Sequence, residues 1–152
     1  MVADARKMIK DFLDARLSAT NMKEDDAVTN ASFIVCFDYP TYPLIRVFND
    51  KEVDLIFSVG KLTNTALTDY TQAPYGYREM VPIDVCCIDK TGITGVKLLQ
   101  KAEAELRRVI ENYTVGTAEW EDLSEGSDIT KFHGRTKIYG VRVILKYVRG
   151  IT

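Results

Sequence analysis

The segment 94–113 constrains the fold of this chain more than any other part of its sequence. Its apolar residues recur every three or four positions, which predicts an amphipathic helix with one face buried in a core. Thr94 stands where an N-cap side chain would accept from the free amides of the first turn, and Gly116 lies just beyond the end. The apolar positions are Val96, Leu99, Ala102, Leu106, Val109, Ile110 and Tyr113.

A second amphipathic helix is predicted near the start of the chain, over residues 3–17. Its charged side chains occupy the other side, where Lys7 can meet Asp11 and Lys10 can meet Asp14 across one turn. The apolar stripe consists of Ala5, Met8, Ile9, Phe12, Leu13 and Leu17.

Several segments have strand character instead. Three short runs, 33–37, 44–48 and 53–59, are separated by short turns and predict a local antiparallel meander. Residues 77–88 resume the strand signal, although Pro82 cannot donate a ladder hydrogen bond and therefore predicts an edge position there. The last strand, 137–148, alternates, and one face carries Tyr139, Val141, Val143, Leu145 and Tyr147.

Two polar segments interrupt these elements. Residues 60–76 are rich in Thr, Asn and Gly, which predicts a long connecting loop, and such loops are often functional. Residues 117–135 are polar and acidic as well. The order of elements predicts one α+β domain spanning residues 1–152, a mainly antiparallel sheet with both helices packed on the same face.

Composition is that of a globular protein, with 46% hydrophobic and 28% charged residues among 152. No apolar run reaches the length of a transmembrane helix, and the N-terminus has no signal-peptide pattern, so we expect an intracellular protein. The three cysteines fit this compartment. Cys86 and Cys87 are adjacent and should point to opposite faces of a strand, and with Cys36 we interpret them as small buried hydrophobic residues.

A search for catalytic and metal-binding patterns yields no complete motif. His133 is the lone histidine of the chain and is interpreted as a surface residue. The glycines of 91–97 lack the Lys-Ser/Thr of a phosphate loop, and the acidic segment 122–128 lacks the spacing of a calcium loop. We therefore expect no enzyme activity and no cofactor, metal ions included.

Two other classes of function stay open. A small-ligand-binding protein or enzyme would need a concave pocket with convergent polar groups. A nucleic-acid module would need the basic residues of the C-terminal strand gathered on one face, which the net charge of −2 does not favour. These residues are Lys131, Arg135, Lys137, Arg142 and Lys146.

Aromatic side chains near the long loop point to protein recognition. Tyr70, Tyr75 and Tyr77 cluster with Arg78, and tyrosine and arginine are enriched at protein interfaces. Two interpretations stay open, tyrosines that fold over the sheet edge and tyrosines that contact a partner. On the second, we predict an interface through residues 60–78, extended by the segment around Trp120.

The order of elements resembles that of phage tail terminators and related minor tail or neck proteins. The resemblance lies in the leading helix, the loop before the strand 81–88 and the glycine-rich entry to the helix at 95–110. It implies a homo-oligomeric ring, commonly six-fold, that caps a tail tube and joins it to the head without catalysis. It also implies assembly in the host cytoplasm and then in the virion, with a tail tube or neck protein as partner. The segment 119–128 is longer and more acidic than this pattern leads us to expect.

Overall fold

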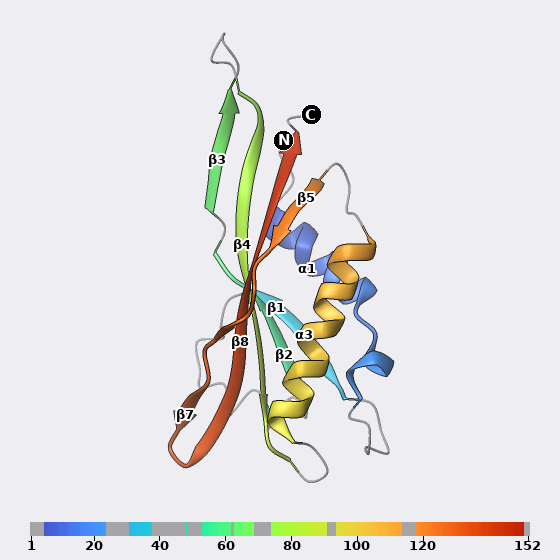
Figure 1. Cartoon of the computed structure of the whole chain (residues 1–152), viewed down its shortest axis with the longest axis vertical. Helices are drawn as coiled ribbons and strands as arrows, with labels where there is room; N and C mark the ends of the chain where they lie inside the picture. The colour runs from blue at the N-terminus through green and yellow to red at the C-terminus, as the bar shows by residue number, and fades with distance from the viewer. Residues whose placement is uncertain are drawn as a thin grey trace.

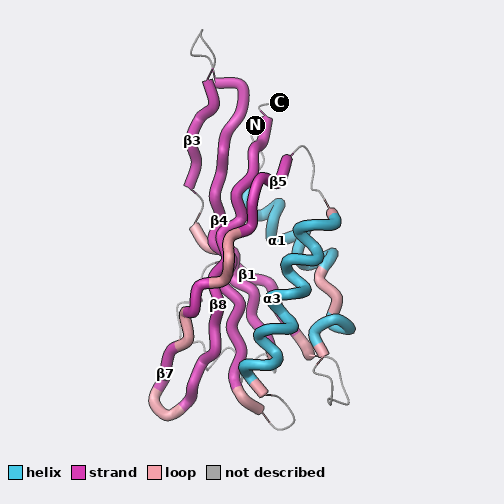
Figure 2. Tube along the Cα trace, viewed as in Figure 1, coloured by secondary structure: helices cyan, strands magenta, loops and turns pink. Residues whose placement is uncertain are grey.

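The structure is a computed structural model that describes residues 5–23, 31–37, 48, 53–61, 63–68, 74–90, 94–113 and 118–150. Figure 1 and Figure 2 show two layers, a long twisted sheet with the helices on one of its faces. The helices are α1 (Ala5–Arg16), the short 3-10 helix η1 (Ala19–Met22) and α3 (Gly95–Asn112). The strands are β1 (Phe33–Phe37), β2 (Leu55–Val59), β3 (Thr63–Thr68), β4 (Pro74–Ile88), β5 (Ala118–Leu123), β6 (Ser127–Asp128), β7 (Lys131–His133) and β8 (Thr136–Gly150).

The sheet is built around β4 and β8, which have 15 residues each. They pair antiparallel along nearly their full length, from Gly76↔Gly150 to Ile88↔Ile138. The main order of strands is β1-β2-β4-β8-β5, while β3 pairs with β4 and both β6 and β7 pair with β8. The predicted fold class, a mainly antiparallel sheet with two helices on one face, is confirmed.

The predicted local meander is wrong. β1 pairs with β2 in parallel, with Phe33 beside Leu55 and Phe37 beside Val59. The chain between these strands is long enough for a crossover, which parallel pairing requires. Of the predicted strand 44–48, only Phe48 lies among the described residues, and its side chain is buried.

The segment 60–76 is not one long loop. Residues Thr63–Thr68 form β3, and β4 begins at Pro74, so the two strands make a hairpin. Residues 69–73 lie outside the described residues. The polar segment after α3 also contains strands, because β5, β6 and β7 all pair with β8. A strand at a sheet edge can keep many of its side chains in water, so a polar sequence can still form a strand there.

Pro82 lies in an interior strand, where the sequence predicted an edge. The amide of Gly60 donates to the Pro82 carbonyl at 2.8 Å. The amide position and carbonyl of one residue point to the same side of a strand, so the ring nitrogen of Pro82 also faces Gly60. This is the place where β2 has ended and β3 has not begun, and the missing donor therefore interrupts no ladder.

Both faces of the sheet are covered where β2, β4 and β8 meet. The main core joins the inner faces of α1, α3 and the sheet, and Cys87 belongs to it. Cys86 points to the opposite face, where it packs with Phe48, Ile56 and Ile138 in a second cluster. The adjacent cysteines thus point to opposite faces and are both buried, as predicted, whereas Cys36 is only partly buried. None of the three forms a disulfide.

The start of α3 is rotated relative to the prediction. Leu98 is the buried apolar side chain of the first turns, whereas Val96 is 48% exposed and Leu99 only partly buried. The Thr94 side chain makes no capping hydrogen bond; the Asp89 carboxylate accepts from the Gly95 amide at 2.7 Å instead. Position 95 must be glycine for packing, since a Cβ there would clash with the Tyr139 ring.

Glu105 ties α3 to the first helical region. Its buried carboxylate accepts from the Ser18 amide at 2.6 Å, from Asn21 at 3.0 Å and from Arg108 at 2.5 Å. Burial raises the pKa of Glu105, but the hydrogen bonds from Arg108, Ser18 and Asn21 outweigh it and leave the pKa below its ordinary value of 4.5.

The first prediction tests the shared core. Leu106 is fully buried beneath α3. Leu106→Ala should lower the free energy of unfolding by about 2–5 kcal/mol, because it removes apolar contacts and leaves a cavity. The measurement is the urea midpoint at an unchanged slope. Glu111→Ala, at an exposed position of the same helix, is the control and should stay within about 0.5 kcal/mol. An equal effect of the two substitutions would contradict this packing.

The second prediction concerns pH. Because the pKa of Glu105 is lower in the folded state, its ionised form stabilises the protein above pH 4.5, and this contribution is lost as pH falls through the folded-state pKa. Glu105→Gln should cost about 1–3 kcal/mol at neutral pH, since it weakens charged hydrogen bonds. The difference from the unaltered chain should shrink in unfolding curves measured well below pH 4.5. A constant difference across pH would refute the assignment, and Glu111→Gln, at an exposed position of α3, serves as control.

Candidate assembly interface

The upper part of the sheet projects beyond the helices (Figure 1). We call this part the arm, and it consists of β3 and the portion Pro74–Met80 of β4 that pairs with it. Neither α1 nor α3 extends alongside the tip of the arm in Figure 1 or Figure 2. The arm is therefore held to the rest of the molecule by strand pairing, mainly with β8.

The structure brings part of the predicted interface onto the arm. Tyr77 is partly buried opposite Ala66, and Arg78 is exposed, with its Nε 2.8 Å from a Glu121 carboxylate oxygen. Tyr75 lies in β4, but its side chain is outside the described residues, as is the whole of Tyr70. Tyr77 and Arg78 point to opposite faces because they are consecutive in a strand.

Trp120 has an internal role that the sequence did not reveal. Its ring lies 5.8 Å from that of Phe12 and 5.6 Å from that of Tyr147. Its indole N–H donates to the Tyr113 carbonyl at 2.6 Å. These contacts join β5 to α1, α3 and β8, so Trp120 helps to close the core, and its predicted contact with a partner stays a prediction.

The outer edge of β3 is open in the described part of the chain, where this strand pairs with β4 alone. Its sequence, TNTALT, contains no charged residue and no proline. Natural edge strands usually carry such residues, which discourage pairing with another chain. Backbone groups of every second residue in a strand point to the same side. The carbonyl of Pro82 points to the β2–β3 side, and so do the backbone groups of Arg78, four residues earlier. Thr65 pairs with Arg78, so its amide and carbonyl face β4. The amides of Asn64 and Ala66 therefore point away from the sheet.

The outer face of the sheet, opposite the helices, carries two exposed apolar side chains near the base of the arm. Met80 is 39% and Ile144 is 40% exposed. Below them, Arg142 forms a two-point ion pair with the buried carboxylate of Asp84, with N–O distances of 2.6 and 2.9 Å. The pairing of β4 with β8 fixes this arrangement, since Asp84 lies directly opposite Arg142.

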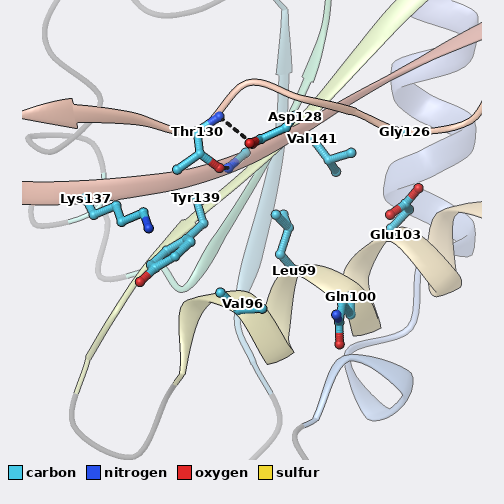
Figure 3. Close-up of a pocket in the computed structure, with 11 residues that line it drawn as sticks. Val96, Leu99, Gln100, Glu103, Gly126, Asp128, Thr130, Lys137, Tyr139 and Val141 are labelled. Atoms are coloured by element: carbon cyan, nitrogen blue, oxygen red, sulfur yellow. Dashed lines mark hydrogen bonds between the residues drawn. The ribbon is translucent and has the colours of Figure 1, made fainter.

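A groove lies between α3 and β8 on the other face. It encloses about 360 Å³. Figure 3 shows Val96 and Leu99 of α3 facing Tyr139 and Val141 of β8, so its floor is apolar. Glu103, Gln100, Asp128 and Lys137 supply the polar groups around it.

Four ionisable side chains line the groove: Glu103, Asp128, Lys137 and Tyr139. Asp128 accepts from the Thr130 amide at 2.9 Å, and hydrogen bonds from Thr130 hold the pKa of this carboxyl below its usual range. Glu103 lies 3.2 Å from Arg107. The Tyr139 hydroxyl donates to Asp89 at 3.1 Å, and this bond raises the pKa of the phenol. The groove thus has an apolar floor and a rim with two carboxylates and one ammonium group.

Other chemistry finds little support in the residues that the structure describes. Within them, no three His, Cys, Asp or Glu side chains are grouped to hold a metal ion. No described helix is long and apolar enough to cross a membrane. His133 is exposed at the end of β7, next to a turn at Gly134 with φ of 62°.

The basic residues of the last strands do not share a face. Lys137 lies on the helix side with Tyr139, whereas Arg142 and Lys146 alternate to the outer face. Arg142 is also engaged with Asp84. Lys131, which pairs with Ile138, shares the outer face with Arg142 and Lys146, so the five basic residues are not gathered on one face.

The comparisons with known proteins give no family. No protein-family model matches this chain, and no curated protein matches its sequence.

The third prediction separates the internal role of Trp120 from a surface role. Trp120→Ala should lower the free energy of unfolding by about 3–5 kcal/mol, because the indole packs between Phe12 and Tyr147. Thermal or urea unfolding measures this loss, and the exposed Asp122 of the same strand, replaced by Ala, provides the comparison. A Trp120→Ala protein of unchanged stability but impaired self-association would reverse the assignment.

Proposed function

We propose that this chain is a non-enzymatic assembly subunit that joins copies of itself through the open edge of its arm. The observation that carries the proposal is β3, an uncharged edge strand without proline on an arm that projects beyond the helices. Strand addition at such an edge would satisfy backbone groups that otherwise bond to water, and would extend one sheet into the next.

The arm suits this role because its position is fixed from within the sheet. β4 continues from the arm into the core, where Val81, Ile83 and Val85 are fully buried. A force that a partner applies to the arm is therefore transmitted to the core through one continuous strand. The Arg78–Glu121 ion pair on the outer face links the arm to β5 as well.

The finer form of the proposal is a ring at the end of a tail tube. The chain resembles phage tail terminator and neck proteins in its order of elements, and a closed ring would leave no β3 edge unpaired. In this form the partners are further copies of the chain, six in the ring that the resemblance implies, together with a tail tube or neck protein.

The fourth prediction tests the edge directly. Ala66→Pro removes an amide that points away from β4, and proline is tolerated at such edge positions. The fold should keep its melting temperature, while the average mass in solution, measured by light scattering or sedimentation across a concentration range, should fall below that of the unaltered chain.

Thr65→Pro is the matched control, one residue away in the same strand. Its amide faces β4, so the substitution removes a hydrogen bond within the hairpin and should lower stability. The proposal is wrong if the unaltered chain stays monomeric at all concentrations. It is also wrong if the Ala66→Pro variant assembles like the unaltered chain.

A further inference from the structure

We propose that the β7–β8 hairpin of one copy inserts Phe132 into the groove between α3 and β8 of a second copy. The inference rests on the proposed function, since it names a contact between identical chains. It concerns a different surface from the edge of β3, and it assigns an occupant to the groove.

Phe132 is the projecting part of this contact. Its side chain is 68% exposed, more than that of any other large hydrophobic residue in the described segments. It stands in β7, opposite Lys137 of β8, next to the tight turn at Gly134. Lys131 and Arg135 flank it, and both are exposed. Lys131 pairs with Ile138 and so points to the opposite face, which leaves the ring beside Lys137 and next to Arg135 of the turn.

The groove has the complementary character. Its floor is formed by Val96, Leu99, Tyr139 and Val141, and its volume of about 360 Å³ leaves room for an aromatic side chain. Val96 at its mouth is 48% exposed, so apolar surface is available for burial. Two carboxylates and one ammonium group surround it, a balance opposite in sign to the hairpin tip. An incoming ring would bury apolar area while Arg135, in the turn next to it, approaches Glu103 and Asp128.

The occupant must come from another chain. Phe132 is held in the β7–β8 ladder beside Lys137, whose Nζ lies 6.0 Å from the ring centroid, and the ring stays exposed although the groove is close by. Lys137 also lies 5.0 Å from the Tyr139 ring in the groove itself. Hairpin and groove are thus neighbouring parts of one surface, on which two copies can exchange contacts reciprocally.

The experiment compares Phe132→Ala with Val96→Arg, which leaves the hairpin intact but fills the mouth of the groove. Each variant alone should associate at least about tenfold more weakly than the unaltered chain, as expected when a central aromatic anchor or the groove that receives it is lost. His133→Ala, one residue from Phe132 in the same strand, is the matched control and should associate normally. Melting temperatures, measured for all three variants, check that each is folded.

Mixing the two variants gives the decisive result. Phe132→Ala supplies an intact groove and Val96→Arg supplies an intact hairpin, so an equimolar mixture should regain association that neither has alone. An unaltered chain that assembles, together with a Phe132→Ala variant that assembles equally well, overturns this inference and leaves the proposed function in place. If Val96→Arg impairs association while Phe132→Ala does not, or if the mixture shows no recovery, the groove takes another part of the neighbour and the inference is wrong. A chain that never self-associates removes both proposals.

Discussion

The pairing of β4 with β8 is the interaction on which the rest of the structure depends. These strands run antiparallel from Gly76↔Gly150 to Ile88↔Ile138, and every other described strand except β1 pairs with one of them. Their inner residues alternate into the helix-side core, where α1 and α3 cover them. Because side chains alternate strictly along a strand, this one register also decides which residues face the second cluster and which remain on the outer surface.

This shared ladder divides the molecule into a covered half and a projecting half. In the lower half both faces of the sheet are buried where β2, β4 and β8 meet, as the opposite placement of Cys86 and Cys87 shows. In the upper half the same strand continues as the arm, with β3 as its open edge in the described residues. The Pro82–Gly60 contact marks the transition, because β4 changes its partner there from β2 to β3. The proposed assembly surfaces therefore inherit their positions from the core.

Much of the fold could be predicted because local periodicity reports directly on burial. The α3 stripe around Leu106 and the alternating face of β8 from Tyr139 to Tyr147 are examples, and both lie in the core as expected. The candidate site was predicted less well. Arg78 lies on the exposed arm, but Trp120 is drawn inward by Phe12 and Tyr147, which are distant in sequence. The groove between α3 and β8 had no sequence signal, since its lining comes from separate segments.

The sequence by itself determined the elements whose pattern repeats within one segment, namely two amphipathic helices and a long alternating C-terminal strand, and with them the mixed α+β fold. Only the tertiary structure decided that β1 joins β2 in parallel, that 63–68 forms an edge strand, and that Asp89 caps α3 in place of Thr94. The physical reason is the range of the interactions. Helical and strand periodicity depends on near neighbours in the chain, whereas strand partners, caps and covered faces depend on groups brought together by folding.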